Sequence, residues 1–333
     1  MPAQQEHNRR KILIKSPNWL GDSVMSIPAV NKVRKLFPQA GIGVKVIPVL
    51  ADLWKLVPEV DTVISGTDKE SIGGFSQVTL LTNSFGSALR MYLARIPERR
   101  GYSINARRWL LTQPVSLPAD WRKMHQIEYF SGIITEPEVG DAKAVPVITI
   151  PASLKEISRE FIGKLGYQQG DYLVGIHATA SYGSAKCWLP DRFACLINRL
   201  IDIYRAKVLI IGGKQERNTI NHIISMVTNR RQVINLAGKT TIKQLAGILT
   251  LCRVFVSNDS GPMHLAAALG VPVVAIFGST SSVRTGPRGN CIVIKKDIAC
   301  SPCFRRSCPY NLECMAAVKV EDVLLAVKEQ NNR

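Results

Sequence analysis

The stretch of the chain that decides the fold is VFVSNDSGPMHLAAALGVPVVAIF, residues 254–277. It opens with an apolar run at 254–256, crosses a short polar segment, continues as an alanine-rich segment to Gly270 and ends in a second apolar run. The polar residues are turn and cap formers, and Pro262 fits a helix only in its first turn, so the pattern predicts strand, loop, helix and strand. Two strands joined through a helix form a parallel βαβ unit.

A helix that begins at the carboxyl end of a parallel strand is a ready anion site. It presents free backbone N–H groups and the positive end of its dipole to the ligand. We therefore interpret Asp259, Ser260 and Gly261, with His264 in the first turn of the helix, as a loop that binds a phosphate or diphosphate. The alternative is that Asp259 and Ser260 only cap a structural helix, which is a common role for both residue types.

The same alternation of strand and helix runs through both halves of the chain. A length of 333 residues exceeds the size of a single core, so two domains are expected. We predict an α/β fold with two Rossmann-like, doubly wound domains, residues 1–150 and 151–333, which are joined through the stretch 140–151 and face a central cleft. The strand candidates are 12–14, 44–49, 62–64 and 78–81 in the first half, and 173–176, 208–211, 233–236, 254–256 and 273–277 in the second.

The formal net charge of +18 indicates anionic partners, such as nucleic acid, an acidic membrane surface or phosphorylated small molecules. The basic residues are scattered and aromatic residues make up only 7%, which argues against a dedicated nucleic-acid surface. Because the sequence has no apolar run long enough to span a bilayer and no signal peptide pattern, we expect a cytoplasmic protein whose membrane contact is at most peripheral.

Three polar residues near predicted strand ends are candidates for chemistry. Asp22 follows the first strand, where a carboxylate can act as a general base; the alternative is an ordinary helix-capping Asp. Lys186 closes a loop of small polar residues and is a suitable point charge for a leaving phosphate, although most lysines are simply surface residues. Glu216 follows a Gly-Gly pair and can accept hydrogen bonds from ribose hydroxyls, but Glu in a first helical turn also suits the helix dipole.

Several familiar motifs are absent from the sequence. It has no G-x-x-x-x-G-K-[ST] loop, no G-x-G-x-x-G after the first strand, no H-E-x-x-H and no Asp-x-Asp triplet. If a nucleotide diphosphate leaves during turnover, its charge is therefore expected to be met by Lys186 and helix N-termini rather than by a bound metal.

Four of the eight cysteines are clustered near the carboxyl end. Cys300, Cys303, Cys308 and Cys314 are separated by gaps of two, four and five residues. Four thiols in so short a segment can close a tetrahedral zinc site, although the gaps differ from the paired C-x-x-C pattern of zinc knuckles. A structural zinc, disulfides and free thiols are the three interpretations.

Four segments together resemble the ADP-heptose:lipopolysaccharide heptosyltransferases: SPNWLGDSVMSIPAV (16–30), LTNSFGSAL (81–89), GSAKCW (183–188) and VSNDSGPMHLAAALGVPVVAIFG (256–278). The spacing before Lys186 and the triplet Asn83-Ser84-Phe85 are most similar to heptosyltransferase II. The resemblance implies a GT-B fold and an inverting, metal-independent transfer from ADP-L-glycero-β-D-manno-heptose to heptosyl-Kdo-lipid A. It also implies that no cofactor is required for catalysis.

The same resemblance implies roles for individual residues of this chain. Asp22 matches the catalytic base and Lys186 the lysine that acts on the donor phosphate. The donor-binding set is Thr179, Lys186, Glu216, Thr240, Asp259, Ser260, Gly261 and His264, and the acceptor-binding candidates are Asn83, Ser84 and Arg107.

The implied partners are the ADP-heptose donor, a lipid A-linked core acceptor and the anionic leaflet on the cytoplasmic face of the inner membrane, but no nucleic acid. Each juxtamembrane Lys or Arg is worth about 1 kcal/mol at such a leaflet. Two other functions fit the sequence: a heptosyltransferase for another core position or another nucleotide sugar, and a non-catalytic, basic nucleotide- or RNA-binding protein with the same fold.

Overall fold

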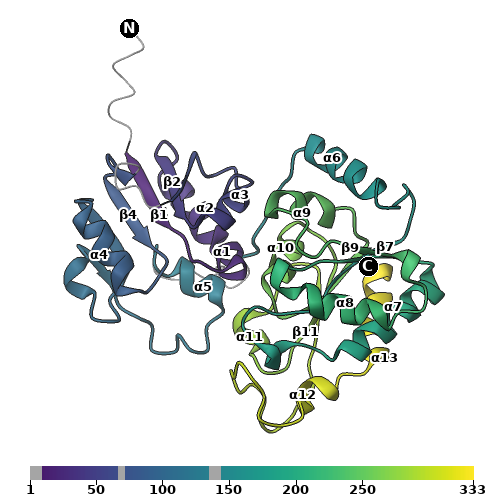
Figure 1. Cartoon of the computed structure of the whole chain (residues 1–333). Coiled ribbons are helices and arrows are strands. Elements are labelled where there is room, and N and C mark those ends of the chain that lie inside the picture. Colours follow the sequence, from purple (N-terminus) through teal and green to yellow (C-terminus); the bar gives the residue numbers. More distant parts are fainter. Residues whose placement is uncertain (1–9, 67–71, 135–143) are drawn as a thin grey trace. The chain divides into compact units, whose positions relative to one another are not determined.

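The computed structural model describes residues 10–66, 72–134 and 144–333, and the chain divides into two compact units, Met1–Pro146 and Val147–Arg333 (Figure 1). The division falls within the stretch 140–151 expected as the linker, of which residues 140–143 lie outside the described residues. In each unit the described residues form one six-stranded sheet in which all neighbouring strands are parallel.

The sheet of the first unit has the order β3-β2-β1-β4-β5-β6. Its strands are β1 (Lys11–Lys15), β2 (Gly41–Val46), β3 (Thr62–Ser65), β4 (Gln77–Leu80), β5 (Glu98–Tyr102) and β6 (Gln113–Val115). The described α-helices are α1 (Leu20–Met25), α2 (Ile27–Leu36), α3 (Ala51–Trp54), α4 (Phe85–Leu93) and α5 (Gln126–Ser131), with short 3-10 turns η2 (Pro48–Leu50) and η4 (Arg108–Leu110). Helices α2 and α4 cover opposite faces of this sheet (Figure 1).

The sheet of the second unit has the order β12-β11-β10-β7-β8-β9. Its strands are β7 (Leu173–His177), β8 (Lys207–Ile210), β9 (Val233–Asn235), β10 (Val254–Asn258), β11 (Val273–Ile276) and β12 (Cys291–Ile294). The α-helices are α6 (Ala152–Gly163), α7 (Pro190–Tyr204), α8 (Arg217–Ser225), α9 (Ile242–Leu249), α10 (Gly261–Ala268), α11 (Ser282–Thr285), α12 (Glu313–Ala316) and α13 (Val320–Asn332), and the 3-10 turns are η6 (Ser184–Lys186), η7 (Lys214–Glu216) and η8 (Arg230–Gln232).

Both sheets have the strand order of a doubly wound fold, and the two orders become the same when the second sheet is counted from its other edge. In such a sheet the chain winds one way from the first central strand and the other way from the second, so a crevice opens beyond the carboxyl ends of those two strands. The central pair is β1 and β4 in the first unit, and β7 and β10 in the second. Strands β7 and β10 are buried along their whole length because helices cover both sheet faces.

The structure differs from the sequence-based expectation at two kinds of place. The apolar helical pattern through Val24 and Phe37 in the sequence would suit one helix, but the structure has two, because Ser26 ends α1 and also caps α2, which places Pro28 in the first turn of α2. Strands β5, β6 and β12 were not predicted. ERRGY and QPV, the sequences of β5 and β6, lack an apolar run, whereas CIVI in β12 is an apolar run as long as β11 that was missed. Strands β6 and β12 are edge strands. Among the described residues, no helix is both long and apolar enough to cross a membrane.

Gly247 on α9 provides a test of the packing between α6 and α9. A Cβ at this position would lie 2.1 Å from Ser158 Oγ, which donates to the Leu154 carbonyl. We expect Gly247→Ala to lower the free energy of unfolding by about 1–3 kcal/mol through overpacking. Urea unfolding followed by circular dichroism measures the change.

Two further variants check this explanation. Combining Gly247→Ala with Ser158→Ala should recover part of the loss, because it removes the clashing hydroxyl. Gly163→Ala on α6 is the matched control, since its Cβ would have no described heavy atom within 4 Å; it should leave stability unchanged or raise it by up to about 1 kcal/mol. Equal losses at Gly163 and Gly247 would contradict the packing argument.

Candidate functional site

Lys186 and Asp259 form a buried ion pair at the carboxyl ends of the central strands of the second unit. Lys186 ends η6 in the loop after β7, and Asp259 directly follows β10. The Lys186 Nζ lies 2.5 Å from Asp259 Oδ2, and the Thr280 hydroxyl donates to the same oxygen at 2.6 Å. The lysine side chain also lies over the Tyr182 ring, 4.9 Å from its centroid. The ammonium is therefore held in one place by a carboxylate and an aromatic face.

His177, the last residue of β7, connects three polar residues of the same edge. Its Nδ1 lies 2.9 Å from Ser260 Oγ, and its Nε2 lies 3.1 Å from Thr179 Oγ1 and 3.5 Å from Glu216 Oε2. The sequence analysis did not assign a role to His177. The sequence feature that could have identified His177 is its position at the end of an apolar run, two residues before Thr179.

Glu216, at the end of η7, is ionised in this environment. Burial raises the pKa of its carboxyl, but the hydrogen bond and charge of His177, together with hydrogen bonds from the Gly213 amide and Thr179, outweigh burial and lower the pKa to about 2. The Gly213 amide donates to Oε2 at 2.6 Å. The carboxylate is thus partly used in fixing the loop after β8.

The helix predicted after the loop 257–260 is α10, and Ser260 is its N-cap. The Ser260 side chain makes no capping hydrogen bond and instead contacts His177 and Ser257, so it does not satisfy the first amides of α10. Gly261 is the first residue of α10, and His264 is buried one turn later. Thr240 is half-buried beside Thr241, the N-cap of α9.

Asp22 lies in the first turn of α1, beyond the carboxyl end of β1, and is partly exposed. A cation shares this edge of the first sheet. Lys15, the last residue of β1, donates to the Ser16 carbonyl at 2.7 Å and to Asn18 Oδ1 at 3.3 Å. Burial, together with the nearby charges of Arg90 and Lys45, lowers the pKa of Lys15 to about 8. Lys15 is a second polar group that the sequence analysis did not single out.

Asn83 and Ser84 follow β4, the neighbour of β1, so both acceptor candidates share the carboxyl edge with Asp22. Ser84 is the N-cap of α4 and accepts from the Ser87 amide. Asn83 Nδ2 donates to the Tyr129 hydroxyl at 2.6 Å.

Arg107, the third acceptor candidate, is fully buried. Its guanidinium donates to the backbone carbonyls of Tyr102 and Thr82, and to Asn83 Oδ1 at 3.4 Å. These contacts fit a residue that positions Asn83 better than one that binds the acceptor directly.

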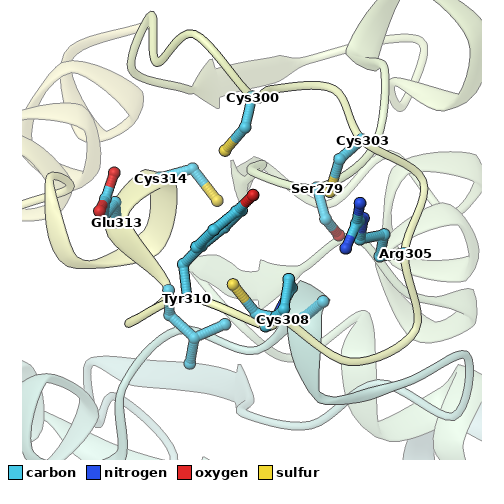
Figure 2. A pocket seen from close by; sticks show the side chains of 11 residues that line it. Ser279, Cys300, Cys303, Arg305, Cys308, Tyr310, Glu313 and Cys314 are labelled. Carbon is cyan, nitrogen blue, oxygen red and sulfur yellow. The ribbon is translucent and has the colours of Figure 1, made fainter.

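The four clustered cysteines line a cavity of about 260 Å³ in the second unit. Figure 2 shows Cys300, Cys308 and Cys314 around the Tyr310 ring, with Cys303 nearer to Ser279 and Arg305. Within the described residues, no three His, Cys, Asp or Glu side chains are grouped closely enough to hold a metal ion. The structure therefore does not support the predicted structural zinc, and all four thiols are free.

The cysteine loop is nevertheless attached to the loops at the carboxyl edge of the second sheet. The Phe304 amide donates to the Ser279 carbonyl, and the Ala185 amide, next to Lys186, donates to the Arg306 carbonyl. A Cβ on Gly183 would lie 2.2 Å from that Arg306 carbonyl oxygen, so only glycine allows this approach. The loop thus supports the segment that carries Lys186.

Residues 72–313 match the family model described as "Glycosyltransferase family 9 (heptosyltransferase)". The chain belongs to this family. The lipooligosaccharide heptosyltransferase 2 of Campylobacter jejuni is 28% identical over 96% of this chain and 97% of that protein, and the enzyme of the same name from Haemophilus ducreyi is 30% identical over 85% and 88%. The structure of the Escherichia coli ADP-heptose lps heptosyltransferase II is similar with a TM-score of 0.85 and 25% identity, over 97% of this chain and 98% of that chain.

As a glycosyltransferase of family 9, the chain has the predicted fold class: an α/β fold of the GT-B type with two Rossmann-like units. Within the second unit the structure brings together six of the predicted donor-binding residues and His177. Thr179, Lys186, Glu216, Asp259 and Ser260 are joined by direct contacts in two groups, and Gly261 continues from them into α10. Thr240 lies beside the N-cap of α9, and His264 lies one turn into α10.

Glu216→Gln tests the His177 network through the pH dependence of stability. Because the folded pKa of Glu216 is about 2, below its ordinary 4.5, the ionised carboxylate stabilises the fold above pH 4.5 and this contribution is lost as the pH falls towards 2. We expect Glu216→Gln to lose about 1–3 kcal/mol at pH 7 and to lose less further stability than the parent protein between pH 4.5 and 2.

Urea unfolding at several pH values in this range measures the effect. The control is Glu156→Gln, because Glu156 is an exposed residue of α6 paired only with Arg159 three residues away. It should change stability by no more than about 0.5 kcal/mol. The same acid dependence in parent and Glu216→Gln proteins would contradict the assigned network.

Proposed function

We propose that the protein transfers heptose from ADP-L-glycero-β-D-manno-heptose to the lipopolysaccharide inner core, with heptosyl-Kdo-lipid A as acceptor. The transfer inverts the anomeric centre and needs no metal ion. Membership of the heptosyltransferase family and the names of the similar proteins support heptose transfer to a lipid-linked core. The observation that carries the proposal is the ammonium of Lys186, held by Asp259 at the carboxyl edge of β7 and β10 beside the amino end of α10.

In this proposal the second unit binds the donor. A lysine ammonium has three N–H donors, so Lys186 can keep its bond to Asp259 and still donate to a phosphate oxygen. The amides at the start of α10 add further donors and the positive end of the helix dipole. Glu216 and Thr179 face the same edge, where a ribose and base would extend from the diphosphate.

The first unit binds the acceptor and supplies the base. The carboxylate of Asp22 takes the proton of the acceptor hydroxyl as that oxygen bonds to the anomeric carbon of the donor. The bond between this carbon and the phosphate oxygen breaks, and its electron pair leaves with ADP, whose charge Lys186 stabilises. A single displacement inverts the configuration. The reaction requires Asp22 to reach a donor held by the other unit, so closure of the two units over the substrates is part of the proposal.

The acceptor is anchored in a membrane, so the proposed location is cytoplasmic with peripheral contact to the inner membrane. Asn83 and Ser84 lie at the same sheet edge as Asp22 and are the proposed contacts for the acceptor sugars. The excess of 43 Lys and Arg over 25 Asp and Glu suits a phosphorylated acceptor in an anionic leaflet.

Direct assay of transfer tests the function. The purified protein is incubated with ADP-heptose and a series of lipid A-linked acceptors truncated at successive core sugars, and the products are analysed by mass spectrometry. We expect the acceptor that ends in the first heptose to gain one heptosyl residue. Gain on a different acceptor would assign another core position, and donor binding without any product would support the non-catalytic alternative.

Asp22→Asn tests the base. We expect kcat to fall by about a hundredfold to ten-thousandfold while the Kd for ADP-heptose changes little, because the amide cannot accept the proton. Stopped assays for kcat and calorimetric titration for Kd separate the two effects. Asp52→Asn is the control, since Asp52 is an acidic residue of α3 that pairs with Lys55. Unchanged turnover in Asp22→Asn would remove Asp22 from the reaction.

Lys186→Ala tests the donor site. Both the affinity for ADP and kcat should fall, each by about tenfold or more, because an interaction with the diphosphate is lost in the ground state and the transition state. Lys186→Arg should recover part of both, since it keeps the charge near Asp259. Lys155→Ala on the exposed side of α6 is the control. Normal ADP binding by Lys186→Ala, with intact folding by circular dichroism, would exclude the assigned role.

A further inference from the structure

Helix α4 of the first unit carries apolar side chains on its solvent side as well as on its inner side. Ala88 and Met91 are buried in a core cluster against the sheet and η4. Phe85 and Tyr92 are seven residues apart and therefore lie on one face of the helix. Both are exposed, as is Leu93, which is 57% exposed. A surface helix of a globular protein normally has a polar outer face, so this pattern needs an explanation.

A third ring completes an exposed aromatic cluster. Trp109 lies in η4, which packs beside α4, and is 64% exposed. Its ring centroid lies 5.9 Å from that of Phe85 and 6.3 Å from that of Tyr92. These three rings and Leu93 are called the aromatic patch below. Because Trp109 contacts both other rings, the three rings form a continuous apolar surface rather than a scatter of single exposed residues.

Arginines lie near the aromatic patch along the chain. Arg90, Arg95 and Arg108 are exposed, and the Arg99 guanidinium lies over the Tyr92 ring, 5.3 Å from its centroid. The segment 85–112 that carries the patch contains a single acidic residue, Glu98. That carboxylate is already paired with Arg10 at 2.7 Å. The segment that carries the patch is therefore strongly positive.

We propose that the aromatic patch and its arginines are the surface by which the protein docks on an anionic phospholipid bilayer. Aromatic rings favour the boundary between headgroups and acyl chains, and arginines beside them bind the anionic headgroups. The positive charge of this segment selects an anionic bilayer as the occupant, because a hydrophobic protein partner does not require exposed arginines beside the rings. The inference rests on the proposed function in one respect: a lipid A-linked acceptor brings the enzyme to a bilayer.

Vesicle co-sedimentation tests the proposal without using catalysis. The protein is mixed with vesicles of phosphatidylethanolamine and phosphatidylglycerol, or with vesicles of phosphatidylcholine alone. We expect binding to the anionic vesicles that weakens at high salt, and at least tenfold weaker partitioning to phosphatidylcholine. Failure of the parent protein to bind the anionic vesicles would overturn the proposal.

Two pairs of variants locate the surface. The double variant Trp109→Ser and Tyr92→Ser should lower partitioning to anionic vesicles at least tenfold. Its control, Leu325→Ser with Ile157→Ser, changes two exposed apolar residues of the second unit and should leave partitioning within twofold. Arg95→Glu with Arg108→Glu should also lower it at least tenfold. Its control, Lys155→Glu with Lys328→Glu, makes the same change in net charge on exposed residues elsewhere and should lower it no more than threefold.

Equal losses of vesicle partitioning in the patch variants and in their controls would show that binding does not depend on this patch, and would overturn the proposal. Light scattering distinguishes a second copy of the chain as occupant, because loss of a dimer in the Trp109 and Tyr92 variant would also overturn it. Transfer to a soluble, deacylated acceptor should be unaffected by this variant, while transfer to an acceptor in vesicles should fall. If the parent protein makes no product at all, the proposed function fails but the vesicle result still decides the docking surface.

Discussion

The parallel pairing of β7 with β10 is the constraint on which the candidate donor site depends. Its register places Ser257 opposite His177, so the loops after the two strands begin at the same level. Gly175 fixes this register, because a Cβ there would lie 2.6 Å from the Phe255 ring that packs across the strand. The chain leaves the two strands towards opposite sides of the sheet, which opens the edge where Lys186 and Asp259 meet.

The charged groups of that edge are paired before any ligand arrives. Asp259 holds the ammonium of Lys186, and Glu216 holds His177, which in turn orders Ser260 at the start of α10. An unpaired buried charge would be costly, whereas a paired one costs little to keep in place. In the proposed donor site, a diphosphate would therefore meet cations and amides that are already oriented, so binding it would require little reorganisation of the protein.

The sequence predicted the central strands and the residues that directly follow them, because buried parallel strands are continuous apolar runs and their loops are rich in turn formers. It did not predict β5 or β6, since ERRGY and QPV lack such a run, and it missed β12, although CIVI is an apolar run as long as β11. Among site residues, Asp22 and Lys186 stood out by position alone. Arg107 and His177 have partners far away in sequence, and so do the charges that lower the pKa of Lys15. Only the structure therefore shows that Arg107 is buried and that His177 links Glu216 to Ser260.

Arginines of the first unit divide into two groups with different consequences for the net charge. Arg99, Arg100 and Arg107 donate to the backbone carbonyls of Leu110, Ile133 and Tyr102, and so connect β5 to η4 and to the segment after α5. Burial lowers the pKa of Arg100 and Arg107, because a charged guanidinium is less well solvated inside the protein than in water. The formal net charge of +18 therefore overstates the positive charge that is exposed to a partner. Attraction to an anionic surface must come from exposed cations such as Arg90, Arg95 and Arg108, whose position beside an apolar surface matters more than the total.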